Sequence, residues 1–97
     1  MAMQIVWTKR AILKFDKIIE YLQVRWGENV TRIFIKRTFD LIDIIAEHKN
    51  IGTIEVEHKN IRAIIVTKHN TMFYRYENDK LIILNFFDNR KNKEKRK

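Results

Sequence analysis

The stretch that decides the fold is Ile61-Arg-Ala-Ile-Ile-Val-Thr67, followed by the runs Thr71-Met-Phe-Tyr-Arg-Tyr76 and Lys80-Leu-Ile-Ile-Leu-Asn-Phe-Phe87. All three runs are rich in β-branched and aromatic residues, which are enriched in strands. The polar breaks between them, at 68–70 and 77–79, are short enough for hairpins. The pattern therefore predicts three consecutive antiparallel strands.

Two helical patterns precede these strands. From residue 9 to residue 26 apolar residues recur at helical spacing, and Gly27 is a natural terminator. A second pattern runs from about residue 28 to residue 47, and its apolar stripe comprises Val30, Ile33, Phe34, Leu41, Ile44 and Ile45. Since a single turn at Gly27 joins two helices of similar length, we expect an antiparallel helical hairpin.

Two shorter segments complete the expected sheet. Gln4–Trp7 is a short apolar run typical of an edge strand, and Thr8 can cap the helix that follows. Residues 48–59 are polar, but the β-branched run Thr53–Val56 inside them indicates a further short strand. Neither helix can bury its stripe alone, so both must lie against one face of the sheet. The predicted fold class is α+β, with a two-helix hairpin packed on a small antiparallel sheet.

The composition excludes several classes of site. The chain has 97 residues, which is one domain, and it contains neither cysteine nor serine, so a disulfide framework and a hydrolytic triad built on either residue are excluded. His48, His58 and His69 are far apart and lie in no ligand motif, and we therefore expect no metal and no cofactor. No apolar run approaches the ~18 residues of a membrane span, so we expect a cytoplasmic protein without membrane contact.

The net charge of +8 is unevenly placed along the chain. Residues 90–97 contain six basic residues and one acid and so carry +5, which leaves +3 for residues 1–89. We expect a single domain over residues 1–89 and a basic C-terminal tail over residues 90–97. The tail is either a solvated end without a dedicated role or an electrostatic handle for nucleic acid or an acidic protein partner.

Arginines stand inside the first two runs, at Arg62 and Arg75, and just past the third, at Arg90. A cation within a strand is costly unless it faces water or an anion. If residue 64 lies opposite residue 71 across the first hairpin, then Arg62, Phe73 and Arg75 share one face of the sheet.

Guanidinium groups beside an aromatic ring suit RNA, because they hold phosphates bidentately while bases stack on the ring. His69, in the break between the first two strands, can exchange a proton near neutral pH. The alternative is that these polar side chains merely solvate the face of the sheet that the helices leave open.

Several short motifs, in this order and spacing, resemble the RelE/ParE superfamily, the toxins of type II toxin-antitoxin systems that are also known as plasmid stabilisation proteins. The motifs are Ile5-Val6-Trp7-Thr8, Trp26-Gly27-Glu28, Val66-Thr67-Lys68-His69, Phe73-Tyr74-Arg75 and Phe87-Asp88-Asn89-Arg90. The resemblance covers about residues 5 to 92. It implies two N-terminal helices against an antiparallel sheet and a cognate antitoxin protein as partner.

The superfamily implies two modes of toxicity. The RelE branch cleaves mRNA in the ribosomal A site without a metal, and the ParE branch poisons DNA gyrase without chemistry. Cleavage is the first expectation, with Arg62, His69, Arg75 and Arg90 as catalytic residues and Lys68, Phe73, Lys91 and Lys93 as contacts to the nucleic acid. Thr71 and Ile64 stand where RelE-like toxins have basic residues, so the gyrase poison, and a small basic binding module that has lost its toxicity, remain as alternatives.

Overall fold

The computed structural model describes residues 3–89, and every predicted helix and strand in this range is confirmed. The elements are β1 (Gln4–Trp7), α1 (Lys9–Trp26), α2 (Glu28–Glu47), β2 (Thr53–Val56), a short 3-10 helix η1 (Glu57–Lys59), β3 (Ile61–Thr67), β4 (Asn70–Glu77) and β5 (Lys80–Asp88). No helix within residues 3–89 is long and apolar enough to cross a membrane.

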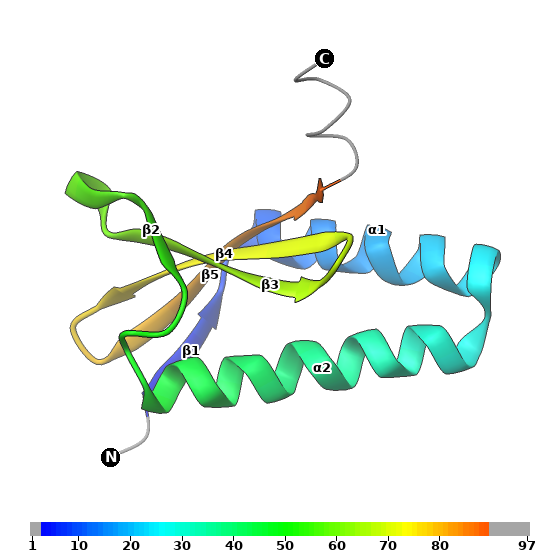
Figure 1. Ribbon diagram of the computed structural model, residues 1–97, viewed down its shortest axis with the longest axis horizontal. Coiled ribbons are helices and arrows are strands. Elements are labelled where there is room, and N and C mark those ends of the chain that lie inside the picture. Colours follow the sequence, from blue (N-terminus) through cyan, green and yellow to red (C-terminus); the bar gives the residue numbers. More distant parts are fainter. Residues whose placement is uncertain (1–2, 90–97) are drawn as a thin grey trace.

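The strands form one sheet in the order β1-β5-β4-β3-β2 (Figure 1). The two hairpins β3–β4 and β4–β5 are antiparallel, as the short breaks in the sequence predicted, and β2 pairs antiparallel with β3. The N-terminal strand β1 pairs parallel with β5 and is an edge strand, as expected. This topology leaves β1 and β2 as the two edges, while the longest strands occupy the centre.

Local signals in the sequence explain where the helical hairpin begins and turns. The Thr8 hydroxyl accepts a hydrogen bond from the Ala11 amide at 3.1 Å, which caps α1, and donates one to the Leu84 carbonyl at 3.0 Å, which ties the start of α1 to β5. Gly27 ends α1 with φ +91° and ψ −178°, a conformation open almost exclusively to glycine, and α2 starts at the next residue.

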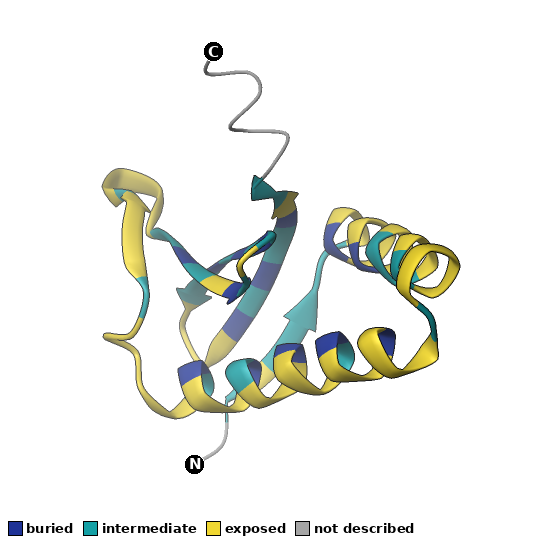
Figure 2. Ribbon diagram, turned by 45° about the vertical axis from the view of Figure 1, so that its right-hand side comes forward, coloured by how far each residue is buried: buried dark blue, intermediate teal, exposed yellow. Residues whose placement is uncertain are grey.

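Both helices pack on the same face of the sheet, and their buried faces turn towards it (Figure 2). An aromatic cluster fills the space between the layers: the Phe15 ring lies 5.1 Å from Trp7, 5.4 Å from Phe34 and 5.4 Å from Phe86. The buried core comprises Ala11, Phe15, Phe34, Ile42, Ile45, Val66, Met72, Tyr74, Leu81, Ile83 and Phe86.

The buried face of α2 differs from the stripe that the sequence predicted. Phe34 and Ile45 are buried as expected, whereas Val30, Ile33 and Ile44 are exposed. Two threonines are buried in the helix instead, because the Thr31 hydroxyl donates to the Gly27 carbonyl and the Thr38 hydroxyl donates to the Phe34 carbonyl, each at 2.8 Å. Satisfied in this way, a threonine behaves as a small core residue.

Two tyrosines of β4 tie the end of α2 and the loop that follows it to the sheet. The Tyr74 hydroxyl donates to the Ile51 carbonyl at 2.7 Å, and the Tyr76 hydroxyl donates to the Ile45 carbonyl at 2.6 Å. Gly52, with φ +89°, lies so close to Tyr74 that a Cβ placed on it would be 2.3 Å from the Tyr74 hydroxyl oxygen and 2.8 Å from the Ala63 carbonyl oxygen. The glycine is therefore required both by its conformation and by this close approach.

Replacing Gly52 with alanine should lower the free energy of unfolding by about 2–4 kcal/mol, because backbone strain and a steric clash add together. Gly27→Ala is the matched control: its φ is +91°, but nothing lies within 4 Å of a Cβ there, so we expect a loss of about 1–2 kcal/mol. Urea denaturation of both variants makes the comparison. Equal losses would show that the contact with Tyr74 has no energetic weight.

Candidate functional site

The candidate site is the face of the sheet that the helices leave uncovered. The pairings place Ala63 opposite Phe73, Ile65 opposite Thr71, and Thr71 opposite Phe87. Residues directly opposite one another share a face, so these side chains form one continuous surface across β3, β4 and β5. Several large apolar side chains are exposed here, among them Ile65 at 63% and Phe87 at 38%.

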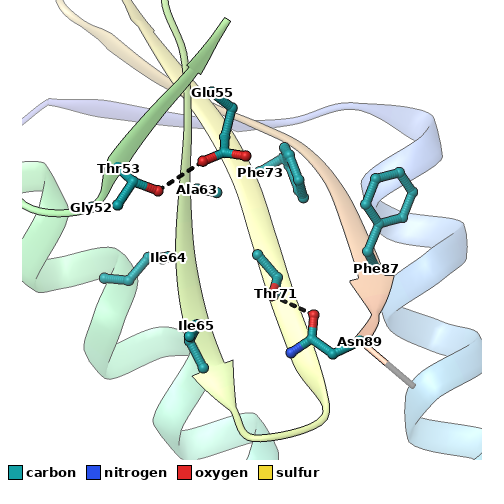
Figure 3. A pocket seen from close by; sticks show the side chains of 10 residues that line it. All are labelled: Gly52, Thr53, Glu55, Ala63, Ile64, Ile65, Thr71, Phe73, Phe87 and Asn89. Atoms are coloured by element: carbon teal, nitrogen blue, oxygen red, sulfur yellow. Dashed lines mark hydrogen bonds between the residues drawn. The ribbon is translucent and has the colours of Figure 1, made fainter. Parts of the chain in front are cut away.

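A groove of about 460 Å³ crosses this face (Figure 3). Its described lining comprises Gly52, Thr53, Glu55, Ala63, Ile64, Ile65, Thr71, Phe73, Phe87 and Asn89. Glu55 is the one charged residue among these ten, and it accepts a hydrogen bond of 2.9 Å from the Thr53 hydroxyl. The groove is therefore apolar along most of its length, with a polar rim at β2.

Phe73 and Phe87 form the aromatic wall of the groove. Their ring centroids are 5.0 Å apart with an interplanar angle of 71°, a favourable edge-to-face geometry. Both rings also line a second hollow of about 430 Å³ on the side where Thr8 and Arg10 begin α1. The two phenylalanines thus form a ridge between two depressions, a shape that suits apolar side chains of a binding partner on either side of it.

Asn89 fixes the polar end of the groove. Its side-chain oxygen accepts a hydrogen bond of 2.6 Å from the Thr71 hydroxyl, and its side-chain amide donates to the Lys68 carbonyl at 3.2 Å. The Asn89 backbone amide donates to the His69 carbonyl at 2.7 Å. These bonds tie the end of β5 to the β3–β4 hairpin. The sequence singled out the motif that contains Asn89 but gave no sign of this positioning role.

The expectation that Arg62 shares a face with Phe73 and Arg75 is wrong. Ile64 lies opposite Met72, and Arg62 lies opposite Tyr74, which is fully buried on the helix side of the sheet. The cause is a bulge between Ile65 and Thr67, which inserts one extra residue into β3. Because side chains alternate along a strand, a shift of one residue moves Arg62 to the opposite face.

Arg62 instead stands beside the tyrosines of β4. Burial raises the pKa of Tyr74 to about 12, with a smaller upward contribution from Tyr76, while the Arg62 cation acts in the opposite direction. Burial also raises the pKa of the Tyr76 hydroxyl, and Arg62 again opposes this. Arg62 itself is half-buried.

The remaining predicted residues lie at two places. Phe73 and Arg75 are together on the open face. The Arg75 Nη2 is 3.2 Å from the Glu77 carboxylate. The buried Arg75 Nε has no hydrogen-bond partner among the described residues. Lys68 and His69 form the β3–β4 turn beside Asn89. Arg90, Lys91 and Lys93 lie outside the described residues. Within residues 3–89 no three His, Cys, Asp or Glu side chains are grouped to bind a metal.

Several solved structures with this fold come from toxin-antitoxin systems. A chain of the chromosomal ParDE system from P. aeruginosa superposes with a TM-score of 0.72 at 17% identity, over 90% of this chain and 96% of that one. The YoeB/ParE toxin from Agrobacterium tumefaciens gives a TM-score of 0.61 at 15% identity, over 89% and 98%. A chain of the YoeB–YefM complex from Staphylococcus aureus gives 0.59 at 11% identity, over 90% and 97%. At these identities the likeness establishes the fold.

The fold is thus that of the RelE/ParE toxins, as the sequence motifs suggested. No curated protein matches the sequence. Residues 5–92 match the ParE toxins of type II toxin-antitoxin systems, parDE, and the chain therefore belongs to that family.

The environment of Tyr74 predicts a specific loss of stability at alkaline pH. The pKa of Tyr74 is about 12 in the folded chain and about 10 when unfolded. The contribution of the protonated hydroxyl to the free energy of unfolding is therefore complete below about pH 10 and is lost as the pH rises towards 12. In urea denaturation between pH 9 and pH 12, the wild type should lose up to about 2–3 kcal/mol more than Tyr74→Phe. Parallel curves for the wild type and Tyr74→Phe would refute the assignment.

Proposed function

We propose that this chain is the growth-arresting toxin of a type II toxin-antitoxin pair, and that it acts by binding a protein target of the DNA gyrase class without cleaving RNA. The observation that carries this proposal is the composition of the open face: an apolar groove with an aromatic ridge, and cationic side chains that do not converge on it.

Metal-free cleavage of RNA needs a base and cations within hydrogen-bond reach of a single phosphate. Of the described candidates, Arg62 lies on the helix side of the sheet, opposite Tyr74, while Arg75 lies on the open face. None of Arg62, Lys68, His69 and Arg75 is among the described residues that line either hollow. The described cations are therefore poorly placed to act together on one phosphate.

The groove has instead the character of a protein interface. Such interfaces combine an apolar, aromatic centre with a polar rim, and a few anchor residues carry most of the binding energy. Here Phe73 and Phe87 provide the centre, and Thr53, Glu55 and Asn89 provide hydrogen-bonding groups at the edge. An exposed apolar surface of this kind on a small, highly charged chain is typical of a binding site.

RNA cleavage is the second candidate, and two observations favour it. Arg75 and Phe73 share the open face, and the Arg75 Nε has no partner among the described residues. The hydrogen bonds of Asn89 also hold the turn that contains Lys68 and His69 at the end of the groove. In this candidate Arg75 holds a phosphate of the bound RNA, while His69, at the opposite end of β4, exchanges the proton at the bond that is cleaved.

A cognate antitoxin is the second partner in the proposal. The heterotetrameric YoeB–YefM toxin-antitoxin complex from Staphylococcus aureus, which includes a chain of the same fold, supports this assignment. The net charge of +8 favours a partner segment that is acidic overall. Both edge strands, β1 and β2, have one unpaired backbone edge within the described sheet, to which an extended segment can add.

The proposal predicts that the purified chain inhibits supercoiling by purified gyrase in proportion to the amount added. Ile65→Glu and Phe87→Glu place a charge in the groove and should weaken inhibition at least about tenfold, because desolvating an unpaired carboxylate is costly. Val24→Glu on α1, at a side chain that is 86% exposed, is the matched control and should inhibit as the wild type does. Thermal unfolding checks that all three variants fold.

Primer extension on cellular mRNA distinguishes the second candidate after induction of the chain. Truncated transcripts that disappear in Arg75→Ala and His69→Ala, together with unimpaired gyrase, would overturn the gyrase proposal in favour of cleavage. Loss of supercoiling without truncated transcripts supports the gyrase proposal.

A further inference from the structure

A partly apolar stripe runs along α2 on a side that the described fold does not cover. Its members are Val30, Ile33, Arg37, Leu41 and Ile44. Ile33 is 65% exposed, Ile44 is 43% exposed and Val30 is 40% exposed, while Leu41 is half-buried. Isolated exposed apolar residues need no explanation, but three exposed residues and the half-buried Leu41 along one helix face form a surface that water disfavours.

The stripe points away from α1. Phe39 marks the α1 side of α2, because its ring centroid lies 6.1 Å from that of Phe15 in α1. Phe39 is two positions beyond Arg37, a rotation of about 200° in an α-helix, so the stripe lies about 160° round the helix from the α1 side. The Arg37 Nε donates to the Val66 carbonyl of β3, which turns this guanidinium back towards its own sheet. Leu41 packs partly against the core, while Val30, Ile33 and Ile44 remain exposed and can meet another surface.

The spacing of the stripe is the same in both directions. Counting from Arg37, apolar residues stand four and seven positions away on each side, at Ile33 and Val30 and at Leu41 and Ile44. An identical helix laid antiparallel, with Arg37 at the crossing point, therefore sets each Ile33 against Leu41 and each Val30 against Ile44 of the other copy. Such self-complementarity is what a two-fold symmetric interface requires.

The charges of α2 favour the same arrangement. Its first half, residues 28–37, has three cations and one anion, a net charge of +2, and its second half, residues 38–47, has three anions, a net charge of −3. Antiparallel packing places the basic half of each copy beside the acidic half of the other, and it also opposes the two helix dipoles favourably. Parallel packing would set like charges side by side.

We propose that this chain forms a homodimer through the α2 stripe, with the two α2 helices antiparallel and crossing at Arg37. The occupant of this face is thus a second copy of the chain. The inference goes beyond the proposed toxicity and does not depend on it, because the stripe lies in the helix layer and the groove lies on the opposite face of the sheet.

Sedimentation velocity of the full chain over a range of concentrations tests the proposal. The wild type should shift from monomer to dimer as the concentration rises. Ile33→Glu and Ile44→Glu should raise the dissociation constant at least about tenfold, since each places a carboxylate in the centre of an apolar contact. Leu13→Glu, on α1 at a side chain that is 62% exposed, is the matched control and should dimerise normally.

A cross-linking experiment tests the register, because the chain has no cysteine of its own. Arg37→Cys should form a disulfide-linked dimer with itself, whereas Val30→Cys should not. Since Arg37→Cys also removes the hydrogen bond to Val66, a second experiment mixes chains carrying Ile33→Cys with chains carrying Leu41→Cys, and cross-links should join the two kinds of chain.

A charge reversal gives an independent outcome. Reversing the charge of the first half of α2 with Arg32→Glu and Lys36→Glu should weaken dimerisation. Adding Asp40→Lys and Asp43→Lys, which reverses the charge of the second half, should restore dimerisation. A wild type that stays monomeric at all concentrations and forms none of these cross-links would overturn the proposal. The same would follow if the glutamate variants left self-association unchanged but abolished binding of the antitoxin, since the stripe would then belong to that partner.

Discussion

The arrangement of this molecule depends on the register between β3 and β4, which the bulge at Val66 sets. Along β4, every second side chain faces the helices and the others face away, so Met72 and Tyr74 lie in the core and Thr71, Phe73 and Arg75 lie on the open face. The bulge on β3 sets which side chains of β3 share each of these two faces. A register without the bulge would set Arg62 opposite Arg75 and bring two guanidinium groups to one face. The chemistry available to the open face is therefore decided by a single inserted residue.

The same constraint separates the molecule into two surfaces with different properties. On the helix side, Tyr74 donates to a carbonyl of the α2–β2 loop and Tyr76 donates to a carbonyl near the end of α2. Arg62 stands beside both tyrosines. On the open side, Phe73 and Phe87 form an aromatic ridge with few charges around it. Two helices cover one face of a five-stranded sheet, so the other face is left uncovered. This division explains how a short, strongly basic chain can present an apolar groove.

Much of the fold could be predicted from the sequence, because local sequence patterns determine where its helices and strands begin and end. Helical spacing ended by Gly27, and apolar runs separated by three-residue breaks, gave the elements with nearly correct bounds. The site could not be predicted in the same way. Nothing in the composition of β3 marks the bulge, so Arg62 was assigned to the wrong face. The exposed side of α2 was also missed, because Val30, Ile33 and Ile44 have the same spacing as core residues, while the buried Thr31 and Thr38 are polar.

The register of β3 against β4 is the central claim, and nuclear Overhauser contacts between backbone protons of a uniformly labelled sample measure it most directly. The account predicts cross-strand contacts that pair Arg62 with Tyr74 and Ile64 with Met72, with the regular pattern interrupted at Val66. Contacts that pair Arg62 with Arg75 and Ile64 with Phe73 would contradict it. In that case the two arginines would share a face, and the open side of the sheet would have the cationic character that RNA cleavage needs.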